Sequence, residues 1–418
     1  MKNIILAISI CTTNLFFIVS SIIGYRFTGS ESNPIYKIYN IIIFISVLYI
    51  FFSEFIRNKL ILLKKDMFLI IILPIFLISN LITTKIFKGY ISIFALNYYF
   101  KYFFLWSYPA ILSGIYFARK EKSLKILYKY IDIFIFISTI SIMKSTIGQF
   151  VLAENFNGIA GASYQTLSYI SAFSYGINLY MIINGKNNLR YSVFTGKLYK
   201  CIEYIFLFIQ VFCALMSGGR GGIVLIFIYT IYYIFLYTDF RDIYKFFKLL
   251  ILILISIIFI IFALELLLKN DVFKTSFDRV FQFISPAGGI NWKGTSGRDI
   301  IYSEAIKEIN ENLMFGIGLF NMEGYYHNIF IDILRSGGLI YLIFVFIFAI
   351  ITLMKLNLIN KYEDKNKVFS VILIYPLVML MFSGSYTTVS ELWFCISFII
   401  SYRVRGDLKN EKDSICSK

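Results

Sequence analysis

Apolar stretches of about 20 residues recur along the whole chain, and short polar segments separate them. A helix of that length crosses the hydrocarbon core of a bilayer and satisfies its own backbone hydrogen bonds there, so the pattern predicts transmembrane α-helices. Hydropathy predicts about 12 spans. Their approximate bounds are 4–24, 38–56, 67–84, 91–118, 126–144, 166–184, 200–217, 221–238, 246–268, 328–354, 368–386 and 391–404.

One predicted connection is far longer than the others. Residues 269–327 join the ninth and tenth spans on the predicted outer side, and loops of this length are usually functional or disordered. Within the loop we expect an amphipathic helix near 297–310 that lies on the outer membrane face, with Ser296 as its N-cap. Its apolar side carries residues at helical spacing, namely Ile301, Ala305, Ile306 and Ile309. The sequence thus predicts an all-α polytopic protein with a single membrane domain over residues 1–418.

Composition and charge support a membrane protein. Hydrophobic residues make up 59% of the chain and charged residues 15%, whereas soluble domains contain about 25% charged residues. The net charge is +16, but no basic stripe with interleaved aromatic residues stands outside the spans, so we do not expect nucleic-acid binding. Lys and Arg collect instead in alternate loops, such as residues 119–125. By the positive-inside rule this alternation predicts an even number of spans, with both termini in the cytoplasm.

The first apolar stretch, after Lys2, is longer than the core of a signal peptide, so we expect an uncleaved first helix. The cysteines show neither a disulfide framework nor zinc spacing. The outer carboxylates Asp299, Glu304, Glu308 and Glu323 also lack a recognisable ligand pattern. Glu304 and Glu308 are more typical of a solvated helix face. The sequence therefore predicts no metal site and no cofactor.

The segment "MSGGRGGI", residues 216–223, lies at the predicted outer turn between the seventh and eighth spans. Gly219 and Gly221 flank Arg220. Glycine lets the backbone approach a ligand closely, and free amide groups at a helix start together with an arginine suit a phosphate. The alternative is a tight helical hairpin whose arginine reaches the membrane interface.

Arg298 stands at the start of the predicted loop helix. An arginine beside a helix N-terminus also suits an anion. The alternative interpretation is a surface ion pair with Asp299 or Glu304.

His327, in "EGYYHNIF", is the only histidine among 418 residues. Histidine is the side chain best suited to move a proton near neutral pH, and this one lies where the large loop re-enters the membrane. The alternative is a helix-end histidine at the interface. Tyr325 and Tyr326 could stack on a sugar, although anchoring at the interface is the more common role of tyrosine there.

These sequence motifs follow one another in a defined order along the chain. The arginine turn comes first, then a long outer loop with Arg298, then Gly316-Ile317-Gly318, His327-Asn328 and Gly338-Leu339. The order resembles the superfamily of bacterial O-antigen polymerases and O-antigen ligases. The resemblance covers residues 210–345, and elsewhere it rests mostly on the number and topology of the spans. The segment "GASYQTLSYISAF", residues 161–173, is weakly similar to the stretch before the family's sixth span.

The resemblance implies a C-type membrane glycosyltransferase in the cytoplasmic (inner) membrane that needs no metal. The implied donor is a glycan on undecaprenyl pyrophosphate, and the implied partners are this lipid-linked oligosaccharide, membrane lipid and a chain-length regulator. Arg220 and Arg298, with Gly219 and Gly221, would hold the pyrophosphate. His327, acting with Arg298, would deprotonate the acceptor hydroxyl or contact the phosphates. Further candidate substrate contacts are Asn328, Tyr325, Tyr326, Arg335, Gln165 and Arg279.

Arg335 departs from the family pattern, which often has an acidic or neutral residue there. It could contact phosphate, but an ion pair with Asp332 three residues earlier is the favoured interpretation.

Two other functions stay open. An O-antigen ligase, which transfers glycan to lipid A-core, shares this chemistry, but the Ile, Phe and Tyr bias favours a polymerase of O-antigen or capsule. A flippase should show ionisable residues at mid-bilayer, broken helices and repeated halves. Lys101, Asp132 and Glu265 are the few candidates for such charges, and no repeat is evident. We therefore expect an enzyme.

Overall fold

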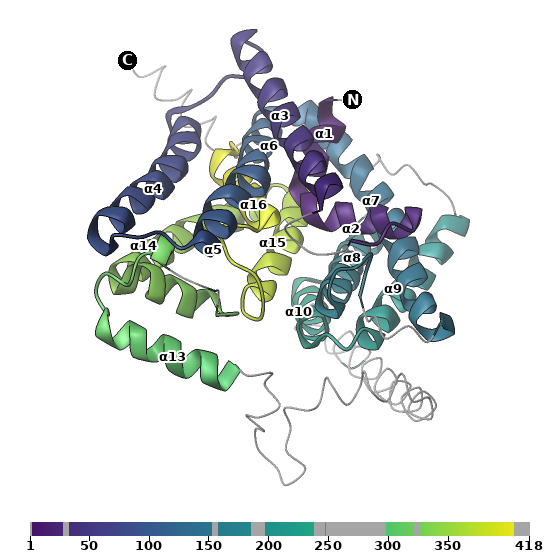
Figure 1. Cartoon of the computed structure of the whole chain (residues 1–418). Coiled ribbons are helices and arrows are strands. Elements are labelled where there is room, and N and C mark those ends of the chain that lie inside the picture. Colours follow the sequence, from purple (N-terminus) through teal and green to yellow (C-terminus); the bar gives the residue numbers. More distant parts are fainter. Residues whose placement is uncertain are drawn as a thin grey trace.

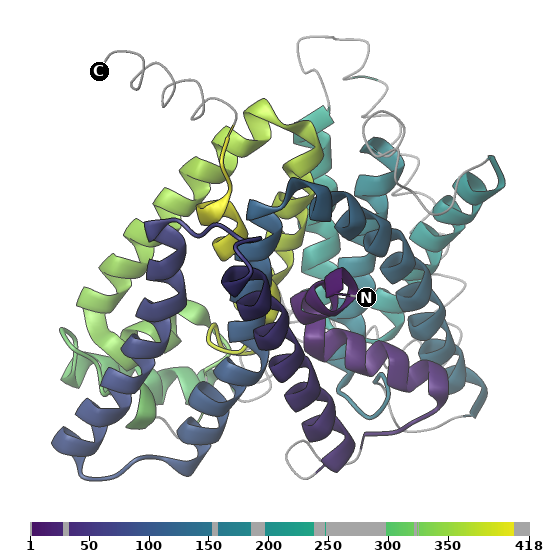
Figure 2. The same ribbon diagram turned by 90° about the horizontal axis from the view of Figure 1, so that it is seen from above.

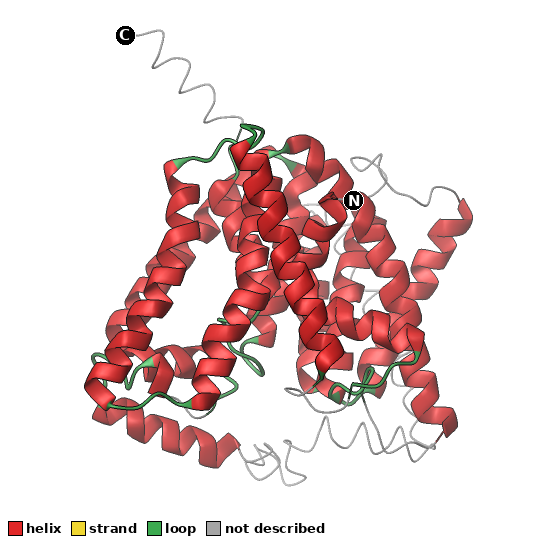
Figure 3. Ribbon diagram, turned by 45° about the horizontal axis from the view of Figure 1, so that its top comes forward, coloured by secondary structure: helices red, strands yellow, loops and turns green. Residues whose placement is uncertain are grey.

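The computed structural model describes residues 2–27, 33–152, 158–184, 197–237, 247, 298–321, 324 and 326–404. Within these ranges every regular element is helical (Figure 3), so the predicted all-α class is confirmed. The predicted span 246–268, apart from Phe247, lies outside the described residues, as does part of the large loop, 269–297.

The helices of the described ranges follow the predicted apolar segments closely. The first half of the chain contains α1 (Lys2–Ile8), η1 (Ser9–Cys11), α2 (Thr12–Ile23), α3 (Pro34–Ile56), α4 (Lys64–Lys88), α5 (Ile93–Ala95), the π-helical η2 (Leu96–Lys101) and η3 (Phe103–Ser107), α6 (Tyr108–Arg119) and α7 (Glu121–Leu152). The remainder contains α8 (Tyr164–Asn184), α9 (Lys197–Met216), α10 (Arg220–Tyr237), α13 (Arg298–Glu311), η5 (Leu319–Asn321), α14 (Ile329–Tyr362), η6 (Asp364–Lys367), α15 (Val368–Met379) and α16 (Ser390–Ser401).

Among the described residues, five helical segments are long and apolar enough to cross a membrane: Lys2–Ile23, Pro34–Ile56, Lys64–Ile86, Lys122–Gly148 and Ile329–Tyr362. Shorter apolar helices are Cys201–Met216, Arg220–Leu236, Val368–Met379 and Ser390–Ser401. These lengths and compositions are those of an α-helical membrane protein. The predicted number of twelve spans stays a prediction.

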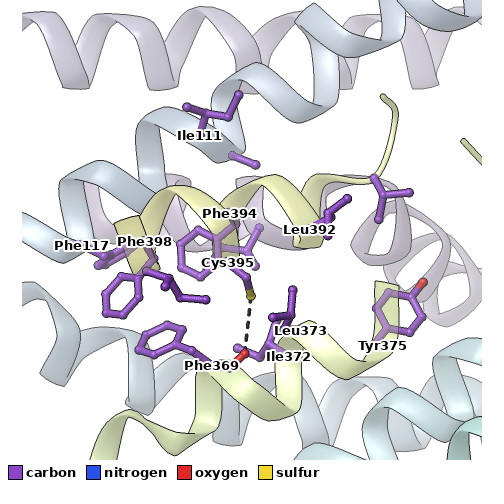
Figure 4. Packing of buried hydrophobic residues seen from close by; sticks show 14 of the residues in the cluster. Ile111, Phe117, Phe369, Ile372, Leu373, Tyr375, Leu392, Phe394, Cys395 and Phe398 are labelled. Carbon is purple, nitrogen blue, oxygen red and sulfur yellow. Dashed lines mark hydrogen bonds between the residues drawn. The ribbon is translucent and has the colours of Figure 1, made fainter. Parts of the chain in front are cut away.

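The centre of the bundle is built from α6, α15 and α16 (Figure 4). Gly114 of α6 permits a close approach of α16, because a Cβ there would lie 2.1 Å from Oγ of Ser397. Small residues allow such contacts between membrane helices. Phe369 of α15 stacks on Phe398 of α16 with ring centroids 3.7 Å apart. This packing fixes α15 and α16, and with them the turn that joins the two helices.

Paired charges gather at one end of the N-terminal helices. Arg119, at the end of α6, donates from Nε and Nη2 to the buried carboxylate of Asp66 at 2.7 and 2.8 Å. Lys2 and Lys120 both pair with Glu54 near the end of α3. Asp66 lies in the first turn of α4, whose 25 residues extend about 37 Å to its other end. At that far end α4 contacts η5, in the segment that precedes His327. The ion pairs and His327 therefore lie at opposite ends of the molecule.

Two helices lie at the edge of the molecule. Figure 1 shows α13 beneath α14, and Figure 2 shows α4 beside α14. The ring of Phe76 on α4 stacks on that of Tyr341 on α14, with centroids 5.3 Å apart. The predicted amphipathic helix near 297–310 falls on α13. Ala305 and Ile309 are buried there, whereas Ile306 is exposed.

Candidate functional site

The turn after α15 brings two predicted site segments together. The carbonyl of Leu380 accepts a hydrogen bond from the Ile329 amide at 3.0 Å, which seats the start of α14. The carbonyl of Phe382 accepts one from Nη2 of Arg298 at 2.9 Å. A cation beside carbonyls at a helix C-terminus is electrostatically favourable. The turn thus holds Arg298 next to the segment that carries His327.

The conformation of His327 is set by its neighbours. Its backbone φ is +56°, a left-handed value that costs a non-glycine residue about 1–2 kcal/mol. Asn328, the next residue, caps α14: its Oδ1 accepts from the amides of Phe330 at 3.0 Å and Ile331 at 3.4 Å. The cap gives Asn328 a structural role, and its predicted contact with substrate stays a prediction. A strained backbone held between fixed neighbours is common at functional sites.

Burial, and then the positive charge of Arg298, lower the pKa of His327 below its ordinary value. A lowered pKa keeps the imidazole neutral near neutral pH, so that it can accept a proton. Arg298 is also close enough to Arg220 for their charges to repel each other. The charge of Arg298 therefore acts on both Arg220 and His327, although the three residues are far apart in sequence. An anion bound between the two arginines would relieve their repulsion.

The glycines around Arg220 pack against α8. Cβ atoms added at Gly219 and Gly221 would lie 2.4 Å from Cβ of Ser168 and 1.9 Å from Oη of Tyr169. Oγ of Ser168 donates to the Gly219 carbonyl at 2.8 Å, which fastens the turn. Close packing against α8 thus accounts for both glycines, and their contact with pyrophosphate stays a prediction. Arg220 is the first residue of α10, and the Gly219 turn lies against Gln165.

The Gly-x-Gly segment and the glycine of α14 form one structural unit. At Gly338 the helix breaks, with φ +65° and ψ −164°, values that essentially only glycine adopts. The break leaves the carbonyl of Arg335 to accept from the Ile317 amide at 2.8 Å. A Cβ at Gly316 would lie 2.6 Å from that same carbonyl. The unit attaches the end of the large loop to α14.

Arg335 does not form the predicted ion pair with Asp332. Its Nε donates to the Glu308 carboxylate on α13, and its guanidinium lies 4.4 Å from the centroid of the Tyr326 ring. Asp332 instead accepts from the Tyr326 amide at 2.8 Å. The prediction failed because the interaction joins two helices, and chain spacing cannot reveal such a partner. Glu308 is likewise an ion-pair partner rather than part of a purely solvated face.

The alternative ion pair of Arg298 with Glu304 is also absent among the described contacts, where the Phe382 carbonyl is the partner of Arg298. Tyr325 and Arg279 lie outside the described residues.

An apolar cavity of about 600 Å³ begins beside the charged groups. Ile329, Phe330 and Phe382 line its near end, and the lining continues along α14 to Leu353. The other walls come from α10, α15 and α16. A second cavity of about 710 Å³ lies between α4, residues 315–319 and α14. Tyr341 and Tyr386 line both cavities.

Sequence reasoning missed Phe382 and Tyr169, and it assigned Glu308 to a solvated helix face. Phe382 contributes a main-chain carbonyl, which has no signature in the sequence. Tyr169 lies within the segment 161–173 that carries the weak resemblance, but only packing relates it to Gly221.

No protein-family model matches the chain, and no curated protein matches it significantly.

Proposed function

We propose that this protein is a membrane glycosyltransferase that polymerises lipid-linked repeat units of O-antigen or capsular polysaccharide. It would transfer a glycan from undecaprenyl pyrophosphate to a second lipid-linked repeat unit at the outer face of the bacterial cytoplasmic membrane. The observation that carries the proposal is the position of Arg298. The charge of Arg298 acts on both Arg220 and His327. Its guanidinium donates a hydrogen bond to the carbonyl of Phe382, a residue that lines the apolar cavity.

The two arginines suit the leaving group. When the glycosidic bond to the pyrophosphate breaks, negative charge develops on the departing lipid pyrophosphate. Guanidinium groups and helix N-terminal amides stabilise such charge, and both are present where Arg220 begins α10. The adjoining apolar cavity along α14 would take the first part of the polyprenyl chain.

His327 suits the acceptor. In the proposed step an acceptor hydroxyl oxygen attacks the anomeric carbon of the donor glycan. The new glycosidic bond forms as the bond from that carbon to the pyrophosphate oxygen breaks, and the hydroxyl proton passes to the neutral imidazole. A positioned base of this kind contributes about 10²–10⁴-fold to the rate. The lowered pKa of His327 keeps this base available near neutral pH.

The proposal is tested with purified protein in lipid nanodiscs. A tag without histidine preserves the single native histidine. With an undecaprenyl-pyrophosphate-linked repeat unit as donor and acceptor, we expect a ladder of longer glycans and release of undecaprenyl pyrophosphate. His327→Ala should lower the rate at least 100-fold, whereas the exposed-loop variant Lys59→Ala should retain it.

Three outcomes would overturn the proposal. An unchanged ladder with His327→Ala would remove the base from the mechanism. Transfer to lipid A-core without self-polymerisation would identify a ligase instead, and movement of the intact lipid across the bilayer without new glycosidic bonds would identify a transporter.

A further inference from the structure

Arg335 lies at the centre of a cluster that joins the elements around the candidate site. The Arg335 cluster consists of Arg335, Glu308, Tyr326 and Asp332. The residue is 4% exposed, although arginine is almost never this buried without partners. Arg335 makes three connections, two through its buried guanidinium and one through its backbone carbonyl, and these require a reason beyond solubility or membrane orientation.

The first connection reaches α13. Nε of Arg335 donates to the carboxylate of Glu308, near the C-terminal end of that helix. Arg298 begins the same helix and is held at the Phe382 carbonyl. Because α13 is one helical element, contacts at both of its ends fix its orientation and therefore the position of the Arg298 side chain.

The second connection reaches the residue before His327. The guanidinium lies 4.4 Å from the centroid of the Tyr326 ring, within cation–π distance, and the Tyr326 amide donates to Asp332. The strained left-handed backbone of His327 follows directly. A strained conformation persists only when its surroundings hold it, and here the holding groups are Arg335 and Asp332 on one side and Asn328 on the other.

The third connection is through the backbone. The Arg335 carbonyl accepts from the Ile317 amide at 2.8 Å, so the same residue also anchors the loop that leads to Tyr326. Arg335 therefore contacts, directly, the helix that carries Arg298 and the segment that carries His327.

We infer that Arg335 is a positioning residue that fixes the positions of Arg298 and His327 relative to each other. It does so because its side chain binds α13 through Glu308 and the His327 segment through Tyr326. The inference rests on the proposed function only in assigning a reaction to that pair. The physical coupling between Arg298 and His327 can be measured whatever the reaction is.

The single histidine makes the test direct. In protein labelled at histidine with ¹³C and ¹⁵N, the imidazole gives one titrating NMR signal, so its pKa is read without assignment. The quantity measured is the change in the His327 pKa caused by Arg298→Gln, first in the native background and then with Arg335→Gln. Comparing the two changes cancels any direct effect of the Arg335 charge on the imidazole. We expect the change to fall to less than half of its native size in the Arg335→Gln background.

Further variants keep the test decisive if Arg335→Gln fails to fold. Glu308→Gln releases α13 but leaves Arg335 over Tyr326, and it should reduce the coupling similarly. Glu304→Gln is the matched control: it removes an exposed carboxylate one turn earlier on α13 and should leave the coupling unchanged. Arg335→Lys keeps the charge without the planar fork and should restore only part of the coupling.

Full native coupling with both Arg335→Gln and Glu308→Gln would overturn the inference. In the polymerisation assay, Arg335→Gln should lower kcat at least 10-fold with less than a 3-fold change in KM, because a positioning residue acts on the step rather than on binding. An inactive native protein with intact coupling would refute the proposed function and leave the positioning role standing.

Discussion

His327 shows how one side chain gains its character from its surroundings. Nothing in its own chemistry distinguishes it from other histidines. Its left-handed backbone, its burial and the nearby charge of Arg298 together select a fixed and neutral imidazole. Neither the burial nor the charge of Arg298 follows from the chain position of residue 327.

The pH dependence of activity should reveal this environment. The base is active when deprotonated, so activity should rise with pH through the His327 pKa, which lies below its ordinary value of about 6.5. Replacing Arg298 with Gln removes a charge that lowers this pKa, so the rising limb should move to higher pH. The measurement is a pH–rate profile of kcat/KM for both proteins. If the rising limb of the profile stayed in place or moved to lower pH, Arg298 would not lower the pKa of His327.

Arg220 should need its guanidinium and not merely its charge. Lysine keeps the positive charge but loses the planar fork that binds phosphate oxygens in pairs. We expect Arg220→Lys to lower the polymerisation rate at least 10-fold at unchanged protein level. Arg57→Lys, an exposed arginine at the C-cap of α3, is the control and should be near wild type. Wild-type activity of Arg220→Lys would remove Arg220 from the pyrophosphate site.

At the scale of elements, the break in α14 organises the site. The first part of the helix carries Asp332 and Arg335, and the long second part lines the apolar cavity. Gly338 is the residue that permits the break. The loop amide of Ile317 pairs with the carbonyl freed there, so the helix and the large loop become one unit.

Substituting Gly338 tests that unit. Alanine would adopt a backbone conformation costing about 1–3 kcal/mol, and its Cβ would lie 2.4 Å from the Met314 carbonyl oxygen. We expect Gly338→Ala to lower the melting temperature by several degrees in nanodiscs. Gly148→Ala is the control: no atom lies within 4 Å of its Cβ position and it is inside α7, so stability should hold or rise slightly.

The sequence predicted the elements better than their contacts. Helical class, both ends of α10 and the end of α3 at Ile56 followed from apolar length. The start of α3 at Pro34 and the end of α14 at Tyr362 lie outside the predicted spans 38–56 and 328–354. The candidate residues Arg220, Arg298 and His327 were chosen from residue type and from the order of short motifs, and their roles stay predictions. The pairing of Arg335 with Glu308, and of Arg298 with the Phe382 carbonyl, could not be predicted. Both depend on how α13 packs across 27 and 84 residues of chain separation.

At the scale of the whole molecule, two groups of charged residues lie at opposite ends of the long helices. The ion pairs of Glu54 and Asp66 occupy one end, and the candidate site occupies the other. Asp66 is fully buried, and a buried carboxylate needs its partner Arg119 to be stable. In the orientation predicted from the positive-inside rule, which stays a prediction, the ion pairs face the cytoplasm.

Cysteine labelling in spheroplasts can test that orientation. In a variant with its five native cysteines replaced, Tyr90→Cys should react with an impermeant maleimide from outside, because the exposed Tyr90 follows α4 at the site end. Lys59→Cys, between α3 and α4 at the ion-pair end, should react only after permeabilisation. The reverse labelling pattern would place the candidate site in the cytoplasm and exclude a donor on the outer leaflet.

The rings of Tyr341 and Tyr386 line both cavities, with centroids 6.3 Å apart. A partition this thin makes the two volumes interdependent. A ligand that enters one cavity and displaces the tyrosines reduces the volume of the other cavity. Two ligands, one in each cavity, could therefore compete without contacting each other. A ligand in the cavity beside α4 would then change the shape of the cavity that extends along α14.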